Sequence, residues 1–200
     1  MIILSNSNDS STNAPAAPVK TPVSLFVLII LILGATYYYA AFVDTSSSNG
    51  PEATVNSFYR AYFEHDYDTV SSETSVFWAI QYLPQYQNLD PAQVMAERSE
   101  IIQDFAEVLY SLGASQPVQG DISIQILPHY TRILSHSALI AYDFIQDGNP
   151  AGMEAALLIK EDGGFKIYSV NPTSEEVMLS VTDDDMELIN NNCKALLGIE

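Results

Sequence analysis

Residues 23–42 form an unbroken run without a charged side chain, dominated by Leu, Ile, Val and Phe. A helix rises about 1.5 Å per residue, so a run of this length matches the hydrocarbon thickness of a bilayer. A helix also makes its backbone hydrogen bonds internally, as lipid requires. We therefore predict one transmembrane helix over residues 23–43, with a disordered tail before it over residues 1–22 and a polar domain after it.

The charges that flank this run indicate its orientation. Lys20 lies just before it and Asp44 just after it, and positive residues are retained on the cytoplasmic side of a membrane. We expect a cytoplasmic tail and a domain outside the cell membrane, joined to the span by a polar linker over residues 44–50. A cleaved signal peptide is the alternative, although a cut after Ala41 would place the large Tyr39 three residues before the cut.

The chain is strongly acidic, with 25 Asp and Glu against 7 Lys and Arg and a net charge of −18. Asp9 and Lys20 cancel each other ahead of the apolar run, so the whole excess belongs to the domain. A field of this sign repels nucleic acid and anionic lipid headgroups, and we therefore expect no nucleic-acid partner. The single cysteine, Cys193, has no partner for an internal disulfide and is expected to be buried.

Helical spacing dominates the first half of the domain. Apolar residues at this spacing predict helices over residues 51–65, 69–82 and 91–112. Pro51 and Pro91 suit the first position of a helix, where no backbone N–H is needed.

Beyond Gly113 the period of the apolar residues changes to two, which is typical of strands. Glycine-containing turn sequences separate the last three of these segments. Three helices followed by an antiparallel meander imply an α+β fold, with the helices packed on one face of a curved sheet. The predicted strands cover residues 121–127, 132–145, 152–160 and 165–170.

The opening of the domain resembles the start of NTF2-like domains, which are also called SnoaL-like or cystatin-related. The resemblance is carried by the Asp66-Tyr67-Asp68 sequence that leads into a second helix, and by the first helix with Val55, Phe58, Tyr59, Ala61 and Tyr62. It covers residues 51–170 of a domain predicted over residues 51–172, and it implies three helices over a strongly bent antiparallel sheet with a cone-shaped pocket between them. It implies no particular chemistry, because a fold alone does not determine function.

The acidic C-terminal segment, residues 173–200, is expected to contribute one short amphipathic helix. Residues 173–180 are polar, and we expect them to leave the domain. Asp183-Asp184-Asp185 suits a helix start and lacks the alternating ligands and the glycine of a calcium loop, so we expect no metal. The apolar face of this helix must cover the domain's own sheet or a partner's groove. It comprises Met186, Ile189, Cys193, Leu196 and Leu197.

The resemblance also implies where chemistry would lie, because enzymes of this fold use a carboxylate or histidine inside the cone as general acid or base. Asp143 is the one catalytic candidate: if its side of the strand faces the cone, it is a buried carboxylate with a raised pKa. The ligand-pocket candidates are Tyr59, Tyr62, Trp78 and Asp143, and Trp78 is expected to pack under the sheet. Further polar candidates are His65, Asp66, His129 and His136.

These patterns favour a membrane-anchored, extracytoplasmic NTF2-like domain of non-catalytic binding type, without a cofactor or metal. Its partner would be a protein or a small apolar ligand. One alternative is a self-associating scaffold of a cell-envelope or secretion machine, and another is an isomerase or dehydratase that uses a pocket carboxylate. A hollow cone with Asp143 pointing inward favours the enzyme, and a filled cone with an exposed apolar patch favours the scaffold.

The topology can be tested by cysteine labelling in intact cells. A cysteine introduced as Ser47→Cys, just beyond the predicted span, should react with a membrane-impermeant maleimide, because the linker is expected outside the membrane. The parent chain is the control, since its Cys193 is expected to be buried. Protection of the new cysteine, or release of the domain into the medium, would contradict the prediction.

Overall fold

The computed structural model describes residues 50–113 and 121–199, which belong to one unit. The transmembrane helix predicted over residues 23–43 and the tail over residues 1–22 lie outside the described residues. Within the described part of the chain, no helix is both long enough and apolar enough to span a bilayer.

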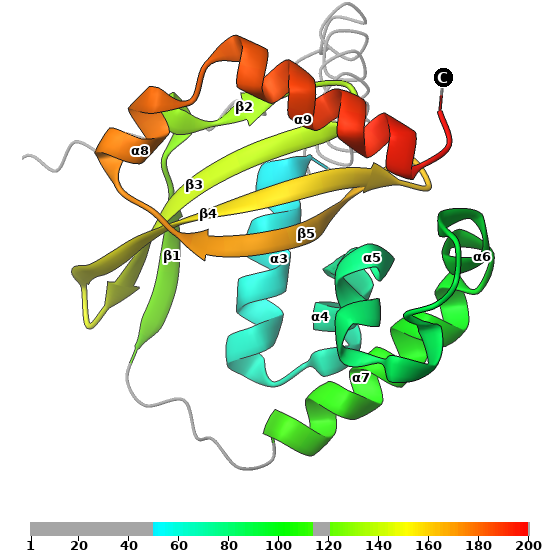
Figure 1. Cartoon of the computed structure of the whole chain (residues 1–200). Coiled ribbons are helices and arrows are strands. Elements are labelled where there is room, and N and C mark those ends of the chain that lie inside the picture. Colours follow the sequence, from blue (N-terminus) through cyan, green and yellow to red (C-terminus); the bar gives the residue numbers. More distant parts are fainter. Residues whose placement is uncertain (1–49, 114–120, 200) are drawn as a thin grey trace, which may run out of the picture. The chain divides into compact units, whose positions relative to one another are not determined.

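Helices come first along the described chain and the main sheet follows, so the predicted α+β class is confirmed (Figure 1). Pro51 opens the first of these helices, as predicted. Asp90 begins α6 with a capping box, because its side chain accepts the Gln93 N–H at 2.9 Å and the Gln93 side chain accepts the Asp90 N–H at 3.1 Å. The helices before the sheet are α3 (Pro51–Glu64), α4 (Tyr67–Glu73), α5 (Val76–Ala79), α6 (Pro91–Ala96) and α7 (Arg98–Gly113), with short 3₁₀ turns η2 (Ile80–Tyr82) and η3 (Pro84–Tyr86).

The strands form one five-stranded antiparallel sheet in the order β1-β3-β4-β5, with β2 also paired to β3. Register shifts after Phe144 on β3 and after Leu157 on β4 add irregularities that bend such a sheet. The bounds are β1 (Ile122–Ile126), β2 (Arg132–Ile133), β3 (Ser137–Gln146), β4 (Asn149–Glu161) and β5 (Gly164–Pro172).

Both tight turns of the meander depend on an Asp-Gly pair. Asp147 and Gly148 connect β3 to β4 with φ values of 51° and 78°, and Asp162 and Gly163 connect β4 to β5 with 48° and 81°. Two successive residues with positive φ make the type I′ turn, whose twist matches that of antiparallel strands. Aspartate tolerates this conformation and glycine has no Cβ to oppose it, so both turns follow from local sequence.

The predicted second helix, residues 69–82, is wrong in its continuity. It breaks at Thr74 and Ser75, where the chain forms a bridge with Ile167 of β5 and the Ser75 N–H donates to the Ile167 carbonyl at 2.9 Å. The Ser75 hydroxyl then accepts the Phe77 N–H at 3.2 Å and caps α5. A hydrogen bond to a distant strand has therefore replaced helical hydrogen bonds that local spacing predicted.

The strand predicted over residues 132–145 is also interrupted, between β2 and β3. Asn190 fills the gap from the C-terminal helix, because its side-chain oxygen accepts the His136 backbone N–H at 2.9 Å. The same oxygen lies 3.4 Å from the Ser137 hydroxyl, which donates to it. The corner between the two strands is thus held by a side chain more than fifty positions away.

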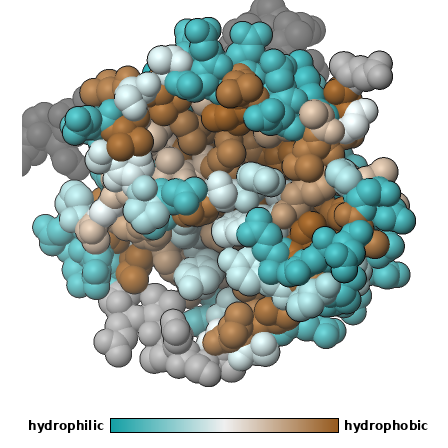
Figure 2. Space-filling model, in the orientation of Figure 1, coloured by the Kyte–Doolittle hydropathy of each residue, from teal (hydrophilic) through white to brown (hydrophobic). Residues whose placement is uncertain are grey.

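The expectation that residues 173–180 leave the domain is wrong. They contain α8 (Glu175–Ser180), which buries Met178 against Tyr130 of the 3₁₀ turn η4 (Pro128–Tyr130) and against Ala141 of β3. The Tyr130 hydroxyl also donates to Glu175. Burial of Met178 and the hydrogen bond from Tyr130 therefore hold this segment against the sheet. Val177 and Leu179 stay exposed, and apolar side chains reach the surface over α8 in Figure 2.

Helices consequently lie on both faces of the sheet rather than on one (Figure 1). One face packs on α3 and α4 through a cluster that includes Val55, Val70, Ile140 and Leu158, with the partly exposed Trp78 against it. The other face is covered by α8 and by α9 (Asp183–Leu196), whose Met186 and Cys193 are buried as predicted from helical spacing. Thr182 caps α9 in a capping box with Asp185.

A buried carboxylate joins the sheet to the helices at the end of β4. The Glu161 side chain is 0% exposed and pairs with Arg98, the first residue of α7. The predicted continuous helix over residues 91–112 is wrong at this point, because α6 ends before Glu97 and α7 begins after it. Glu161 also accepts the Ser75 hydroxyl at 2.5 Å and the Val76 N–H at 3.4 Å. Burial raises the pKa of Glu161, while Ser75 and Arg98 act in the opposite direction.

Removing Arg98, the positive partner of Glu161, should reveal the free-energy cost of burying the Glu161 charge, and this cost should depend on pH. Arg98→Met leaves a buried carboxylate without its counter-charge and should reduce the free energy of unfolding at pH 7 by about 3–5 kcal/mol. Because burial raises the pKa of Glu161 in the fold, its contribution to the free energy of unfolding is complete below the unfolded pKa of 4.5. This contribution is lost as the pH rises through the folded pKa and the buried carboxyl ionises. The destabilisation measured by urea unfolding should therefore shrink as the pH falls towards 4.

Lys166→Met is the matched control, because it removes the more exposed ion pair with Glu73, whose nitrogen and oxygen are 3.2 Å apart. It should cost about 1 kcal/mol or less. An Arg98→Met cost that is equal at pH 4 and pH 7 would show that the Glu161 charge is not its cause.

Candidate functional site

An aromatic cluster occupies the space between α3 and the sheet. Tyr59 and Phe63, one turn apart on α3, face Tyr142 and Phe144, which alternate on β3. The Tyr59 ring centroid lies 5.1 Å from that of Tyr142 and 5.2 Å from that of Phe144. Phe63 lies 6.5 Å from Phe144 in an edge-to-face arrangement, which is a favourable geometry for aromatic pairs. The spacing of four residues on the helix and of two residues on the strand thus places each pair of rings on one face and brings the four rings together.

Three polar groups meet inside this cluster. The hydroxyl oxygens of Tyr59 and Tyr142 lie 2.6 Å apart, and each is placed to donate to Glu154 Oε2 of β4 at 3.1 Å. The two tyrosines are 6% and 0% exposed, so their hydroxyls depend on one another and on the carboxylate for hydrogen bonds.

Burial raises the pKa of both tyrosines well above the ordinary range. For each hydroxyl the largest cause is desolvation of the charged form, and the neighbouring Glu154 charge raises the pKa further. The tyrosines are therefore neutral hydrogen-bond donors near neutral pH. They are poor candidates for proton removal by themselves, since a general base needs a pKa near the working pH.

A hollow of about 330 Å³ opens beside the three polar groups, at the end of the sheet where β3 and β4 bend. Its wall is mostly apolar, and Glu154 is the one charged group among the described residues that line it. A second hollow of about 700 Å³ adjoins it along α3 and shares two lining residues, Phe63 and Ile122. The smaller hollow is lined by Phe63, Ile122, Phe144, Gln146, Ala151, Gly152, Met153, Glu154 and Pro172.

Glu154 lines the smaller hollow, and one of its two carboxylate oxygens has no hydrogen-bond donor among the described residues. Both tyrosine hydroxyls lie against Oε2, and no described residue donates a hydrogen bond to Oε1. In the described part of the chain, every buried side-chain nitrogen or oxygen has a hydrogen-bond partner. Oε1 is therefore not buried, and it is the atom that a molecule in the hollow would meet.

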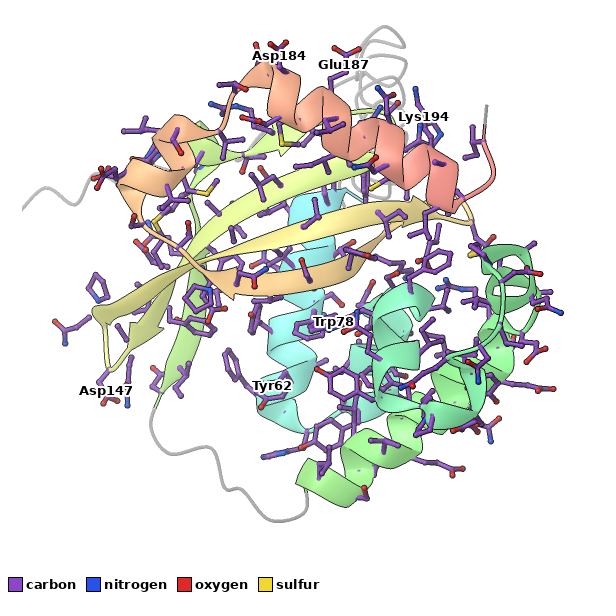
Figure 3. The ribbon with its side chains drawn as sticks, in the orientation of Figure 1. Tyr62, Trp78, Asp147, Asp184, Glu187 and Lys194 are labelled. Carbon is purple, nitrogen blue, oxygen red and sulfur yellow. The ribbon has the colours of Figure 1, made fainter. Side chains whose placement is uncertain are left out.

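The four predicted pocket residues are not brought together. Tyr59 alone belongs to the polar cluster, whereas the rings of Tyr62 and Trp78 (Figure 3) each stack on Phe58, with centroids 6.4 Å apart. Asp143 alternates with Tyr142 on β3 and therefore faces the other side of the sheet, opposite Gln125 and Met153 in the neighbouring strands.

The remaining polar candidates have local roles. His65 ends α3 in the left-handed conformation, with φ of 59°, and its Nδ1 lies 2.9 Å from the Tyr67 hydroxyl. Asp66 caps α4 by accepting the Thr69 N–H at 3.2 Å. The His129 ring lies against that of Tyr130, with centroids 3.8 Å apart and the planes tilted by 50°, and His136 donates its backbone N–H to Asn190.

Glu154 is the residue that sequence reasoning missed. It lies in a correctly predicted strand, between the apolar Met153 and two alanines. An isolated acid in an otherwise apolar strand is a usable signal, because burial of an unpaired charge is costly. The residue's partners come from α3 and β3, however, and the register that places them opposite Glu154 is not visible in the sequence.

Neither a metal centre nor a family match identifies the site. The described residues contain no group of three or more His, Cys, Asp or Glu side chains placed to hold a metal ion. Comparison of the chain with protein-family models, with curated proteins and with solved structures gives no match. The inference of function therefore depends on the geometry of the polar cluster and its hollow.

The contribution of the polar cluster can be measured by removing one hydroxyl. Tyr142→Phe should reduce the free energy of unfolding at pH 8 by about 1–2 kcal/mol, because Tyr59 and Glu154 each lose a buried hydrogen bond. Because the pKa of Tyr142 is raised in the fold, its contribution to stability is complete below the unfolded value of about 10 and is lost progressively as the pH rises above it. The fall in stability between pH 8 and pH 10.5 should therefore be shallower in the variant.

Tyr82→Phe is the matched control, since Tyr82 is 50% exposed. It should change the free energy of unfolding by no more than about 0.5 kcal/mol. Equal costs for the two variants in urea unfolding would show that the buried cluster adds no stability.

Proposed function

We propose that this domain is a non-catalytic binding module of the NTF2-like type, which holds a small apolar ligand in the hollow beside Glu154. The order of helices before a bent antiparallel sheet supports the fold assignment. The observation that carries the function is the mostly apolar hollow of about 330 Å³ with one polar group at its wall. Ligand pockets typically have a volume of about 300–1,000 Å³ and a few placed polar groups in an apolar lining.

The position of Asp143 supports binding rather than catalysis. It lies on the opposite side of the sheet from Tyr142 and from the hollow's aromatic rings. Among the described residues that line the hollow, Glu154 is the one acid and there is no base. The tyrosines behind Glu154 are neutral. General acid–base chemistry usually needs two titratable groups of different pKa, so this arrangement favours a binding site.

The proposal places the domain outside the cell membrane, attached through residues 23–43. It is supported by the length of the uncharged run and by the flanking Lys20 and Asp44. The first described helix begins at Pro51, so the linker of residues 44–50 would lie between the span and the domain.

Self-association as a scaffold is the second candidate. Val177 and Leu179 on α8 are 53% and 71% exposed, and Leu188 on α9 is 62% exposed. Exposed apolar side chains that gather on one surface mark protein contact sites, and Figure 2 shows apolar side chains at the surface over α8. Sedimentation equilibrium of the purified chain separates the two candidates, because ligand binding in the hollow requires no second copy.

Filling the hollow should abolish binding. Gly152 lines the hollow on the same side of β4 as Glu154, and a Cβ at this position would meet no atom within 4 Å. Gly152→Trp should therefore keep the fold and occupy the ligand's space. We expect neutral probes such as toluene and p-cresol to shift the backbone amide signals of β4 in NMR titrations of the full chain, and to lose this effect in the variant.

Two controls define the result. Leu188→Trp adds the same side chain at an exposed position of α9, and Asp143→Asn changes the opposite side of the sheet. Both variants should bind the probes as the parent does. If no probe perturbs the amides of β4 in the parent chain, the hollow is not an apolar ligand site.

A further inference from the structure

Glu154 presents a negative charge that nothing described in the chain compensates. No described lysine, arginine or histidine forms an ion pair with it, and no basic residue is among those that line its hollow. Arg60 lines the adjoining larger hollow but makes no ion pair with Glu154. The two tyrosine hydroxyls each lie 3.1 Å from one carboxylate oxygen, and no described residue donates to the other. A carboxylate held in this way favours an occupant that brings a positive charge.

The rest of the hollow suits an organic cation better than a hydrated metal ion. Phe63 and Phe144 line it, with Met153 and Pro172 nearby in the same wall. Aromatic rings attract cations through their quadrupole, and ammonium groups with alkyl substituents also bury apolar surface against such walls. The wall offers a single carboxylate, whereas calcium takes six to eight oxygen ligands and magnesium keeps most of its water.

The charge of the whole chain acts in the same direction. A net charge of −18 raises the local concentration of cations around the domain and disfavours anionic ligands. This long-range attraction is screened by salt. The local carboxylate and the aromatic rings would remain effective at higher ionic strength, because partly buried charges are screened less.

We propose that the hollow binds a small alkylammonium cation, with the charged nitrogen at Glu154 Oε1 and the alkyl groups against Phe63 and Phe144. This inference rests on the proposed function, because the alkyl groups are the apolar part of the ligand that the hollow takes, and it adds a positive charge at the ligand's nitrogen. Glu154 fixes the charge of the ligand, and the aromatic rings accommodate its substituents. The buried Tyr59 and Tyr142 position the carboxylate and do not touch the ligand.

An isosteric pair of probes tests the charge separately from the shape. Choline and 3,3-dimethyl-1-butanol differ in one atom, a positively charged nitrogen in place of a carbon. In NMR titrations of the full-length chain, in a neutral sugar detergent, choline should bind about tenfold more tightly than the alcohol. Both should shift the amide signals of β4, and Gly152→Trp should abolish both effects.

Two substitutions, each of which removes one negative charge, show which carboxylate causes the preference for choline. Glu154→Gln keeps an oxygen that can accept from the tyrosines, and should weaken choline binding about tenfold while the alcohol binds as before. Glu187→Gln removes the same charge from the exposed side of α9, where the side chain points away from the sheet (Figure 3). It should leave both affinities unchanged. Trp78 fluorescence and circular dichroism verify that each variant is folded.

The outcomes separate this inference from the proposed function. If both probes bind equally, or the alcohol binds more tightly, the hollow is an apolar site and the inference of a cation is wrong. If choline binding is equally weakened by Glu154→Gln and Glu187→Gln, the overall field and not the site selects the cation, and the inference is again wrong. If neither probe binds to the folded parent, and toluene and p-cresol do not bind either, the proposed function fails with it.

Discussion

The carboxyl group of Glu161 is the constraint on which the arrangement of the domain depends. It takes hydrogen bonds or charge from the turn before α5 and from the start of α7, and it belongs to the end of β4. A carboxylate removed from water is costly unless all of its partners are in place. The hairpin of β4 and β5 can therefore lie in few positions relative to the helices, and this in turn fixes the strand that carries Glu154.

Features that depend on a few consecutive residues could be predicted. The start of α3 follows from Pro51, the two Asp-Gly turns follow from the left-handed preferences of their residues, and the α+β class follows from the change in apolar period after Gly113. Features that depend on a residue distant in the sequence could not be predicted. The break at Thr74 needs Ile167, and the gap before β3 needs Asn190.

The candidate site shows the same division. Tyr59, on the apolar face of α3, reaches the polar cluster beside the smaller hollow without lining that hollow, whereas Tyr62 stacks on Phe58 of the same helix. Asp143 was undecidable because β3 is apolar on both faces, and only the packing of α3 and α8 shows which face lies inside the bend. Glu154 is recognised as a site residue only from the register of β4 with β3, which pairs it with Tyr142.

The polar cluster has one more oxygen contact than it has protons. Two hydroxyls supply two protons, yet three short contacts join Tyr59, Tyr142 and Glu154. At any instant one tyrosine donates to the carboxylate and the other donates to that tyrosine, so two arrangements exist that differ by rotation of O–H bonds alone. Packing thus fixes the three oxygens but leaves the direction of the proton chain open. Because Oε2 keeps one donor in either direction, a molecule that reaches Oε1 finds the same carboxylate in both.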